Sequence, residues 1–270
     1  MRYFTDSPFE RLMMEVPHGH SLAAEAAWRH EQQATGKPAA FSLTSKSERR
    51  SSLNSTLIIA EKPSVALAIA AVVGADKRKN GYLEGNGYLV SWCVGHLVSL
   101  AQPENYDLRR ARWRRADLPI LPDPWQYVPN EKTKKQLDLL CSLMNRPDIE
   151  TIVCATDAGR EGELIFRLVY DCCRCSKPVK RLWISSLEES AIREGMAHLK
   201  DAAEYDLLSE AALCRAKADW LVGINLTRLY TLLYGPTLSI GRVMTPTLAM
   251  IVEREKAIAD FTPKPFYTVH

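Results

Sequence analysis

The sequence lacks any apolar run approaching the roughly 18 residues of a membrane-spanning helix, so no transmembrane segment is expected. Near the amino terminus, Asp6 and Glu10 stand where a secretory signal peptide would keep an uninterrupted apolar core. The sequence has no G-x-x-x-x-G-K-[ST] loop for ATP phosphates, and no G-x-G-x-x-G dinucleotide signature follows its first apolar segment. These absences argue against a membrane protein, a P-loop ATPase and a dinucleotide-dependent enzyme.

Cysteines are few and odd in number, seven in 270 residues. Cys172 and Cys175 form one C-x-x-C, but a structural zinc site needs a second ligand pair nearby. Because no secretory signal is visible, we predict reduced thiols and a cytoplasmic location.

The composition is that of a globular protein. Hydrophobic residues make up 46% and charged residues 25% of the chain, close to the averages of ~45–50% and ~25% for folded domains. The length fits one large or two modest domains. Such a chain can bury a substantial core, which excludes a collagen-like repeat, a disulfide-stapled miniature and disorder throughout.

The net charge of +3 is unevenly distributed. Residues 106–135 hold eight basic and four acidic side chains, together with Tyr106, Trp113, Trp125 and Tyr127. Basic groups interleaved with aromatics suit single-stranded nucleic acid, because one kind neutralises phosphate and the other stacks on bases. The alternative is a solvated loop whose aromatics anchor it to the core. Both interpretations stay open from this segment alone.

Residues 1–55 differ from the rest and are predicted to be a leader and linker. A short helix is expected over residues 21–33, and the serine-rich stretch FSLTSKSERRSSLNST has almost nothing to bury. The ordered domain should therefore begin at Thr56.

Strands and helices alternate over residues 56–200, which predicts an α/β domain with a mostly parallel sheet. The hairpin signal is Gly85-Asn86-Gly87, and Ser186-x-x-Glu189 resembles a capping box. The expected strands are residues 56–60, 150–156 and 180–184. Four helices are expected: one that ends near Val73, one over residues 131–145, one that begins near Arg160 and one that begins at Ser186. From residue 201 to 270 only helices are expected, one following apolar positions from Leu207 to Asn225 and one over 242–259.

Acidic residues follow two of the expected parallel strands. Glu61 and Lys62 come after the first, and Asp157 comes after the second, with Arg160, Glu161 and Glu163 close behind. Ligands bind beyond the carboxyl ends of parallel strands, and carboxylate oxygens suit Mg²⁺ engaged with phosphate. The alternative is that these acids only cap and favour a helix start.

Several segments together resemble a known family. LIIAEKPSVALAIA, WCVGHL and above all CATDAGREGELIFR resemble the Toprim domain of type IA DNA topoisomerases, in particular the bacterial topoisomerase III group. The resemblance continues in order through KADWLVGINLTRLY, LSIGRVMTPTLAMIVERE and FTPKPFYTV, and covers about residues 56–270. It implies a Toprim domain over 56–200 and the start of a helical domain over 201–270.

The resemblance also implies roles for individual residues. Glu61 matches the first Toprim acid, a magnesium-site residue and proton donor to the leaving 3′ oxygen, and Lys62 matches a lysine that contacts the scissile phosphate. Asp157 and Glu161 match the first and third acids of D-x-D-x-E, so the implied metal set is Glu61, Asp157 and Glu161. The residues implied near DNA are Arg160, Arg215, Asp219 and Arg242.

The implied reaction is transesterification without ATP, with Mg²⁺ as cofactor and single-stranded, negatively supercoiled DNA as substrate. A tyrosine cuts one strand, holds it as a 5′-phosphotyrosyl bond and reseals it after strand passage. None of the ten tyrosines stands in the family's Y-P-R-T-D context. We therefore expect the nucleophile to be absent from this chain, and the chain alone to be inactive.

Two further positions depart from the family pattern. Gly159 replaces the middle acid of D-x-D-x-E, which leaves fewer metal ligands, and Met244 stands where many relatives carry glutamine after GRV. Two other interpretations remain: a non-catalytic fragment that binds Mg²⁺ and single-stranded DNA, and another Toprim enzyme such as a primase or nuclease.

Overall fold

The structure is a computed structural model that describes residues 55–268. Every element given below belongs to one compact unit, Ser52–His270. The helix predicted over residues 21–33 and most of the serine-rich linker lie outside the described residues.

A seven-stranded mixed sheet forms the centre of this unit, in the order β2-β3-β4-β1-β7-β8-β9. The four strands β4, β1, β7 and β8 are parallel, and the pairings outside them are antiparallel. The predicted α/β fold with a parallel sheet is therefore confirmed for the four central strands. The strands are β1 (Ser55–Ala60), β2 (Lys77–Arg78), β3 (Tyr82–Gly85), β4 (Tyr88–Trp92), β7 (Ile149–Ala155), β8 (Val179–Arg181) and β9 (Lys200–Asp201).

Strand β1 lies at the centre because its side chains are apolar on both faces. Leu57 and Ile59 enter one core cluster, whereas Ile58 and Ala60 enter the other. Successive side chains of a strand point to opposite faces, and a parallel strand covered on both sides needs a continuous apolar run. The sequence TLIIA supplies that run.

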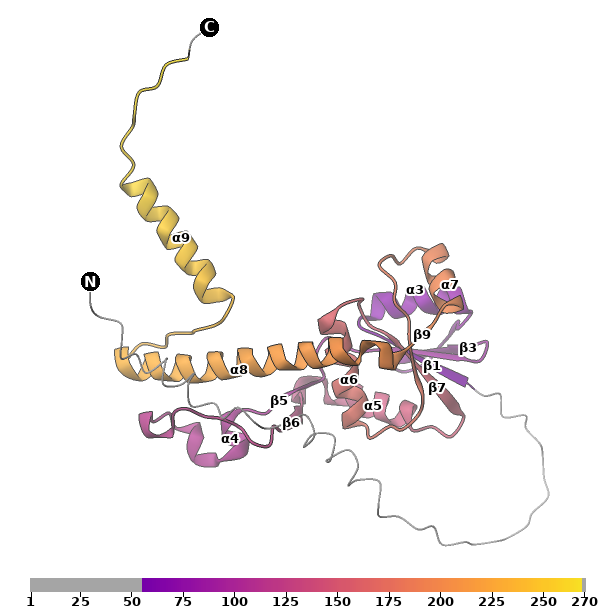
Figure 1. Ribbon diagram of the computed structural model, residues 1–270. Coiled ribbons are helices and arrows are strands. Elements are labelled where there is room, and N and C mark those ends of the chain that lie inside the picture. Colours follow the sequence, from indigo (N-terminus) through magenta and orange to yellow (C-terminus); the bar gives the residue numbers. More distant parts are fainter. Residues whose placement is uncertain (1–54, 269–270) are drawn as a thin grey trace, which may run out of the picture. The chain divides into compact units, whose positions relative to one another are not determined.

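Helices cover both faces of the sheet (Figure 1). Helices α3 (Pro63–Val73) and α7 (Glu189–Ala197) contribute to the cluster that contains Ile58, and α5 (Lys134–Met144) and α6 (Arg160–Cys172) to the cluster that contains Leu57. Pro63 opens α3, where its missing N–H costs no helical hydrogen bond.

The predicted hairpin is confirmed between β3 and β4. Asn86 and Gly87 both have positive φ, 48° and 79°, and the flanking residues Gly85 and Tyr88 pair. Two central residues with positive φ are the requirement of the tight turn that matches strand twist, and Asn-Gly satisfies it best.

Two predicted element boundaries were wrong. Strand β8 ends at Arg181 rather than at residue 184, because Trp183 leaves the ladder and stacks on Tyr205. The capping box at Ser186 does not form. Helix α7 begins at Glu189, and the Ser186 hydroxyl instead accepts a hydrogen bond from the Glu188 N–H within the preceding turn.

The prediction that all cysteines are reduced was also wrong. Cys141 on α5 and Cys173 at the end of α6 form a disulfide, with Cα atoms 4.8 Å apart. The two residues are 32 positions apart in sequence. They meet because α5 and α6 pack side by side on one face of the sheet.

Outside the seven-stranded sheet, the basic segment (residues 106–135) and its neighbours pack against a long helix. This region contains the two-stranded sheet of β5 (Val98–Leu100) and β6 (Tyr127–Pro129), the short helix α4 (Pro103–Tyr106), and α8 (Asp206–Tyr234). Three short 3₁₀ turns, Leu108–Ala111, Arg115–Asp117 and Glu131–Thr133, lie in the basic segment, and a fourth, Ala202–Tyr205, precedes α8.

Two side chains of α8 hold the basic segment in place. The Trp220 indole N–H donates to the carbonyl of Ala101 at 3.0 Å and meets the ring of Trp125 edge-on at 5.4 Å. Asn225 both accepts from and donates to the backbone of Ile120, at 2.6 and 3.0 Å. Trp125 is thus a packing anchor, as one of the two interpretations of this segment predicts.

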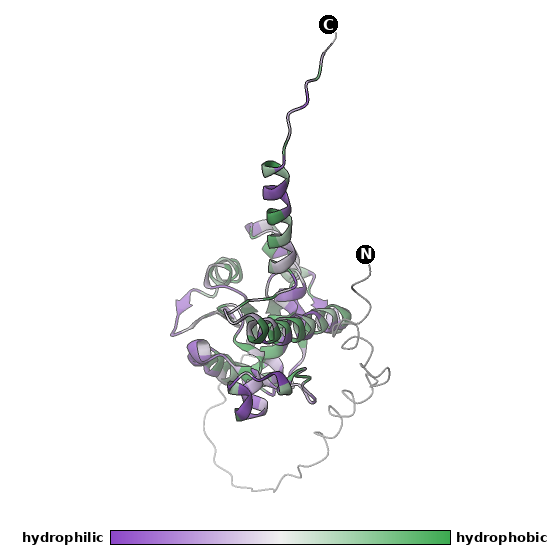
Figure 2. Cartoon of the chain, turned by 90° about the vertical axis from the view of Figure 1, so that its left-hand side faces the viewer, coloured by the Kyte–Doolittle hydropathy of each residue, from purple (hydrophilic) through white to green (hydrophobic). Residues whose placement is uncertain are grey.

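Helix α9 (Met244–Ala259) has no buried residue among those described. Leu248, Met250 and Ile251 are each more than half exposed, and Figure 2 shows hydrophobic and hydrophilic residues mixed along the helix. Over residues 55–268 no helix combines the length and apolar character needed to cross a bilayer.

Candidate active site

The parallel strands bring Glu61 and Asp157 together. Glu61 follows β1 and Asp157 follows the neighbouring β7, so both lie at the same edge of the sheet. The Glu61 carboxylate accepts a hydrogen bond from the Asp157 backbone N–H at 3.3 Å. The Glu61 side chain is 13% exposed and that of Asp157 is 54% exposed, so one carboxylate is recessed behind the other.

Lys62 lies between these two carboxylates. Its Nζ is 3.4 Å from Asp157 Oδ2 and 3.9 Å from Glu61 Oε1. Two carboxylates that share one cation form a site of concentrated negative charge, which a divalent cation or a lysine can neutralise.

Glu161 belongs to a second run of charges. It lies in the first turn of α6, 3.5 Å from Arg215 of α8 and 3.5 Å from Nε2 of His96. Arg215 in turn lies 3.8 Å from Asp219. Asp219 accepts hydrogen bonds from Arg242 at 2.5 and 3.2 Å. These bonds, with the charge of Arg215, lower the pKa of Asp219 below its usual value.

The expected convergence of three acids is therefore only partly realised. In the described part of the chain no three His, Cys, Asp or Glu side chains gather as a metal-binding set. Glu61 and Asp157 meet, whereas the carboxylate of Glu161 is engaged by Arg215 and His96. The side chain of Arg160, at the first position of α6, is exposed.

The departures at Gly159 and Met244 are compatible with the backbone. Gly159 is the N-cap of α6 with φ 179°, an extended conformation open to any residue, and a Cβ there would meet nothing within 4 Å. A carboxylate at this position would therefore fit. Met244 is the first residue of α9 and is half-exposed.

A buried arginine supports the loop that carries Asp157. The Arg181 side chain is 0% exposed, and Nη2 donates to the Asp157 carbonyl at 2.8 Å. Nη1 donates to three more backbone carbonyls, those of Cys154, Thr156 and Leu182. Gly162 closes the loop from the other side, because a Cβ there would lie 2.2 Å from the Asp157 oxygen.

Glu163 balances the charge of Arg181 and links it to α8. Its Oε2 lies 3.0 Å from Arg181 Nε, and since neither atom has a hydrogen-bond partner the pair is held by charge. Oε1 accepts from Arg167 at 2.9 Å, and Arg167 also reaches Asp206 at 2.9 Å and the carbonyl of Ala202. This network of Arg181, Glu163 and Arg167 joins the Asp157 loop to the start of α8.

Sequence reasoning missed the roles of Arg181, Arg167 and His96. Glu163 was expected at the sheet edge, but it is buried. The spacing of Glu163 and Arg167 by four residues was an available signal for an ion pair within one helix turn. No local signal marked Arg181, because all its hydrogen-bond and ion-pair partners except Leu182 lie in β7, the loop after it and α6, earlier in the sequence.

Nearby thiols are unsuited to nucleophilic chemistry. Cys93 follows β4 at the same edge, and burial, with the charge of Glu61 adding to it, raises its pKa to about 12. Burial also raises the pKa of Cys154 to about 11. Both thiols stay protonated at neutral pH, and the thiolate is the nucleophilic form.

Comparisons with known proteins agree with this fold. Residues 56–187 match the family model described as the Toprim domain, and residues 203–270 match the model described as DNA topoisomerase. DNA topoisomerase 3 of Bacillus subtilis is 49% identical over 217 residues, 80% of this chain and 30% of the relative. That of Shouchella clausii is 49% identical over 212 residues, 78% of this chain and 29% of the relative.

A solved structure supports the fold. Full-length topoisomerase I from Thermotoga maritima matches with a TM-score of 0.56 and 23% identity, over 77% of this chain and 31% of that chain. The chain thus combines a Toprim domain with topoisomerase sequence. It belongs to the type IA DNA topoisomerase family and resembles the bacterial topoisomerase III group. It spans about 30% of the length of the curated relatives given above.

Proposed function

We propose that this chain is the amino-terminal, metal- and DNA-binding portion of a topoisomerase III-like enzyme. The observation that carries the proposal is the pair Glu61 and Asp157 at one sheet edge, with Lys62 between them. The proposed boundary between a Toprim domain over 56–200 and a helical region over 201–270 accords with the two matched segments. A cytoplasmic location remains a prediction.

Glu61 and Asp157 would hold Mg²⁺. Magnesium is usually bound by one or two protein carboxylates, with waters and substrate phosphate completing its shell, and this pair fits that donor set. When bound, the ion neutralises charge that develops on the phosphate oxygens during strand transfer. Glu161 remains a proposed third ligand, which would have to exchange its contacts with Arg215 and His96 for the metal.

The remaining residues of the site are assigned to DNA and to proton transfer. Lys62 would turn from Asp157 toward the scissile phosphate, and Glu61, the more recessed carboxylate, would deliver a proton to the leaving 3′ oxygen. Arg160, Arg215 and Arg242 would contact phosphates of single-stranded DNA, and Asp219 would orient both Arg215 and Arg242. Because the phosphotyrosyl link preserves the bond energy, the reaction would need no ATP.

The nucleophilic tyrosine is proposed to come from sequence outside this chain. Tyr230 and Tyr234 stack on each other at 6.0 Å on α8, which suits packing. A purely binding role is therefore the second candidate for the isolated chain. Another Toprim enzyme, such as a primase or nuclease, is disfavoured by the match of residues 203–270 to DNA topoisomerase.

The test measures binding and relaxation on the same preparation. The 270-residue chain should bind a fluorescein-labelled 12-mer of deoxythymidine, and Mn²⁺ titrated by calorimetry should report a metal site. It should not relax negatively supercoiled plasmid with Mg²⁺ and without ATP. Absence of both binding signals would refute the proposal, and relaxation by a clean preparation would place the nucleophile among the ten tyrosines of the chain.

The basic segment gives a further prediction on salt dependence. Arg112 and Arg115 are exposed, whereas Arg109 is held by Asp107 at 2.7 Å. Each phosphate contact to a single strand contributes about −0.7 to the slope of log affinity against log salt. Arg112→Gln with Arg115→Gln should reduce the magnitude of the slope by about 1.4, as measured by fluorescence anisotropy from 50 to 200 mM salt.

The matched control is Arg193→Gln, which removes an exposed arginine that pairs with Glu189 on α7. This variant should leave the slope unchanged. An unchanged slope in the double variant would assign Arg112 and Arg115 to a solvated loop with no DNA contact.

A further inference from the structure

An aromatic pair, Trp183 and Tyr205, lies at the same sheet edge as Glu61 and Asp157. Trp183 follows β8, and Tyr205 comes directly before α8. The two rings stack with their centroids 4.6 Å apart and their planes 21° from parallel. Trp183 is nevertheless 36% exposed, so this pair is a surface feature that the core does not absorb.

The order of the strands places Trp183 one strand beyond Asp157. Strands β1, β7 and β8 are parallel neighbours, so Glu61, Asp157 and Trp183 follow their carboxyl ends in that order along the edge. Neighbouring strands lie about 4.8 Å apart. The aromatic pair is therefore within reach of a nucleotide next to one that is held at Asp157.

Arg215 lies on the other side of the two carboxylates. It is 3.5 Å from Glu161, which is in turn 3.5 Å from His96. His96 follows β4, the neighbour of β1 on the side away from β7. A single strand that contacts Arg215 and crosses Glu61 and Asp157 would therefore continue toward Trp183.

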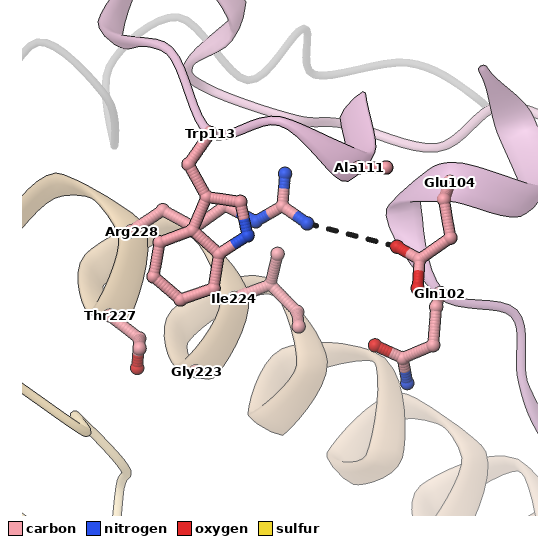
Figure 3. A pocket seen from close by; sticks show the side chains of 8 residues that line it. All are labelled: Gln102, Glu104, Ala111, Trp113, Gly223, Ile224, Thr227 and Arg228. Atoms are coloured by element: carbon pink, nitrogen blue, oxygen red, sulfur yellow. Dashed lines mark ion pairs between the residues drawn. The ribbon is translucent and has the colours of Figure 1, made fainter. Parts of the chain in front are cut away.

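The course of α8 agrees with this order. Tyr205 directly precedes the helix, and Arg215 lies in the turns that follow. A cavity lined by Gly223 and Arg228 lies further along the helix (Figure 3). The aromatic pair and this cavity are thus on opposite sides of Arg215 along α8, and the pair is a separate site.

One face of the Trp183 indole is available for stacking. Tyr205 covers the other face. The Arg181 guanidinium lies 5.0 Å from the centroid of Trp183 and 6.0 Å from that of Tyr205. A cation against the free face would be separated from Tyr205 by the whole indole, at a distance well above 6.0 Å. Arg181 therefore lies beside the stack and leaves the free face open.

The aromatic pair is held in place and has a cation beside it. Arg181 also donates to the carbonyl of Asp157 at 2.8 Å, so one buried side chain supports both the pair and the loop of the acidic site. Lys200, the β9 partner of Arg181, is exposed, and its Nζ lies 6.0 Å from the Tyr205 ring. A fixed aromatic surface beside an exposed ammonium suits single-stranded DNA, because one stacks on bases and the other neutralises phosphate.

We propose that Trp183 is a stacking site for one base of single-stranded DNA, on the side of Glu61 and Asp157 away from Arg215. The inference rests on the proposed function, because it assumes that the strand crosses these two carboxylates. Stacking uses the face of a base and not its hydrogen-bonding edge, so the site accepts any base. Lys200 neutralises a phosphate of the same segment. The strand is then held on both sides of the phosphate that reacts, by Arg215 and by Trp183.

The test measures the affinity of the 270-residue chain for a labelled 12-mer of deoxythymidine by fluorescence anisotropy. Trp183→Leu should weaken binding about five- to tenfold, because the stacking of one base is lost. Trp183→Phe should restore most of the affinity, since it keeps an aromatic face. The slope of log affinity against log salt should be unchanged in Trp183→Leu, whereas Lys200→Gln should lower its magnitude by about 0.7.

Tyr88→Leu is the matched control, since Tyr88 is a half-buried aromatic at the start of β4, at the opposite edge of the sheet. It should bind within twofold of the wild type. Equal affinities of Trp183→Leu and the wild type would overturn the stacking site. A lower slope in Trp183→Leu would also overturn it, because phosphate contacts rather than a base would have been lost. Failure of the wild type to bind the oligomer would instead refute the proposed function, so the two failures are distinguishable.

Discussion

Replacing Arg181 with methionine should destabilise the chain by about 3–5 kcal/mol, because removing one partner of a buried ion pair leaves the other charge without compensation. Arg181 is fully buried, and its guanidinium is shared among four backbone carbonyls and Glu163. The variant removes one donor from each of these carbonyls, of which that of Cys154 still accepts from the Leu182 N–H. Urea unfolding followed by circular dichroism would measure the loss as a lower midpoint at unchanged slope.

The control for this prediction is Arg193→Met on α7. Arg193 and Glu189 also form an ion pair, at 2.6 Å, but their side chains are 61% and 68% exposed. Exposed pairs of this spacing contribute about 0.3–0.5 kcal/mol, so the control should be nearly as stable as the wild type. A loss below about 1 kcal/mol for Arg181→Met would show that water or a rearranged Arg167 replaces the lost donor.

The buried network also explains how two distant segments meet at the site. Arg181 holds the carbonyl of Asp157, Glu163 pairs with Arg181, and Arg167 continues from Glu163 to Asp206 at the start of α8. Arg215 and Asp219 lie further along the same helix. The loop that carries Asp157 and the helix that carries Arg215 are therefore positioned by one set of charges. These charges are satisfied only when β8, α6 and the start of α8 are all in place.

The central strands and the long helices could be predicted from the sequence because local pattern determines them. Leu57–Ala60 are apolar at every position, as a strand buried on both faces requires, and Asn86-Gly87 is one of the dipeptides that favour its turn. The shared edge of Glu61 and Asp157 also followed from the sequence, since consecutive parallel strands end on the same side.

The remaining features depend on contacts between distant residues. The disulfide of Cys141 with Cys173 requires knowing that α5 and α6 are neighbours. Asn225 is hydrogen-bonded to the backbone of Ile120, 105 residues away, and the sequence pattern of neither segment predicts that contact. The separation of Glu161 from the other acids likewise depends on where α8 brings Arg215.

The second large effect is expected at Glu61. Glu61→Gln should reduce Mn²⁺ affinity at least tenfold, because even residues that only support a metal ligand cost about 10–100-fold when they are changed. The amide retains an oxygen that can accept the Asp157 N–H, so the fold and the affinity for single-stranded DNA should be preserved. Calorimetric titration of Mn²⁺ and anisotropy of a labelled oligomer measure the two properties separately.

Glu104→Gln is the matched control, since Glu104 lies on α4, 3.8 Å from Arg228 of α8, and not at the sheet edge. It should leave Mn²⁺ affinity unchanged. In a longer protein that also contains the nucleophilic tyrosine, Glu61→Gln should abolish plasmid relaxation, because both metal binding and proton delivery to the leaving oxygen are lost. Normal Mn²⁺ affinity together with normal relaxation would remove Glu61 from the mechanism and leave Asp157 as the principal carboxylate of this edge.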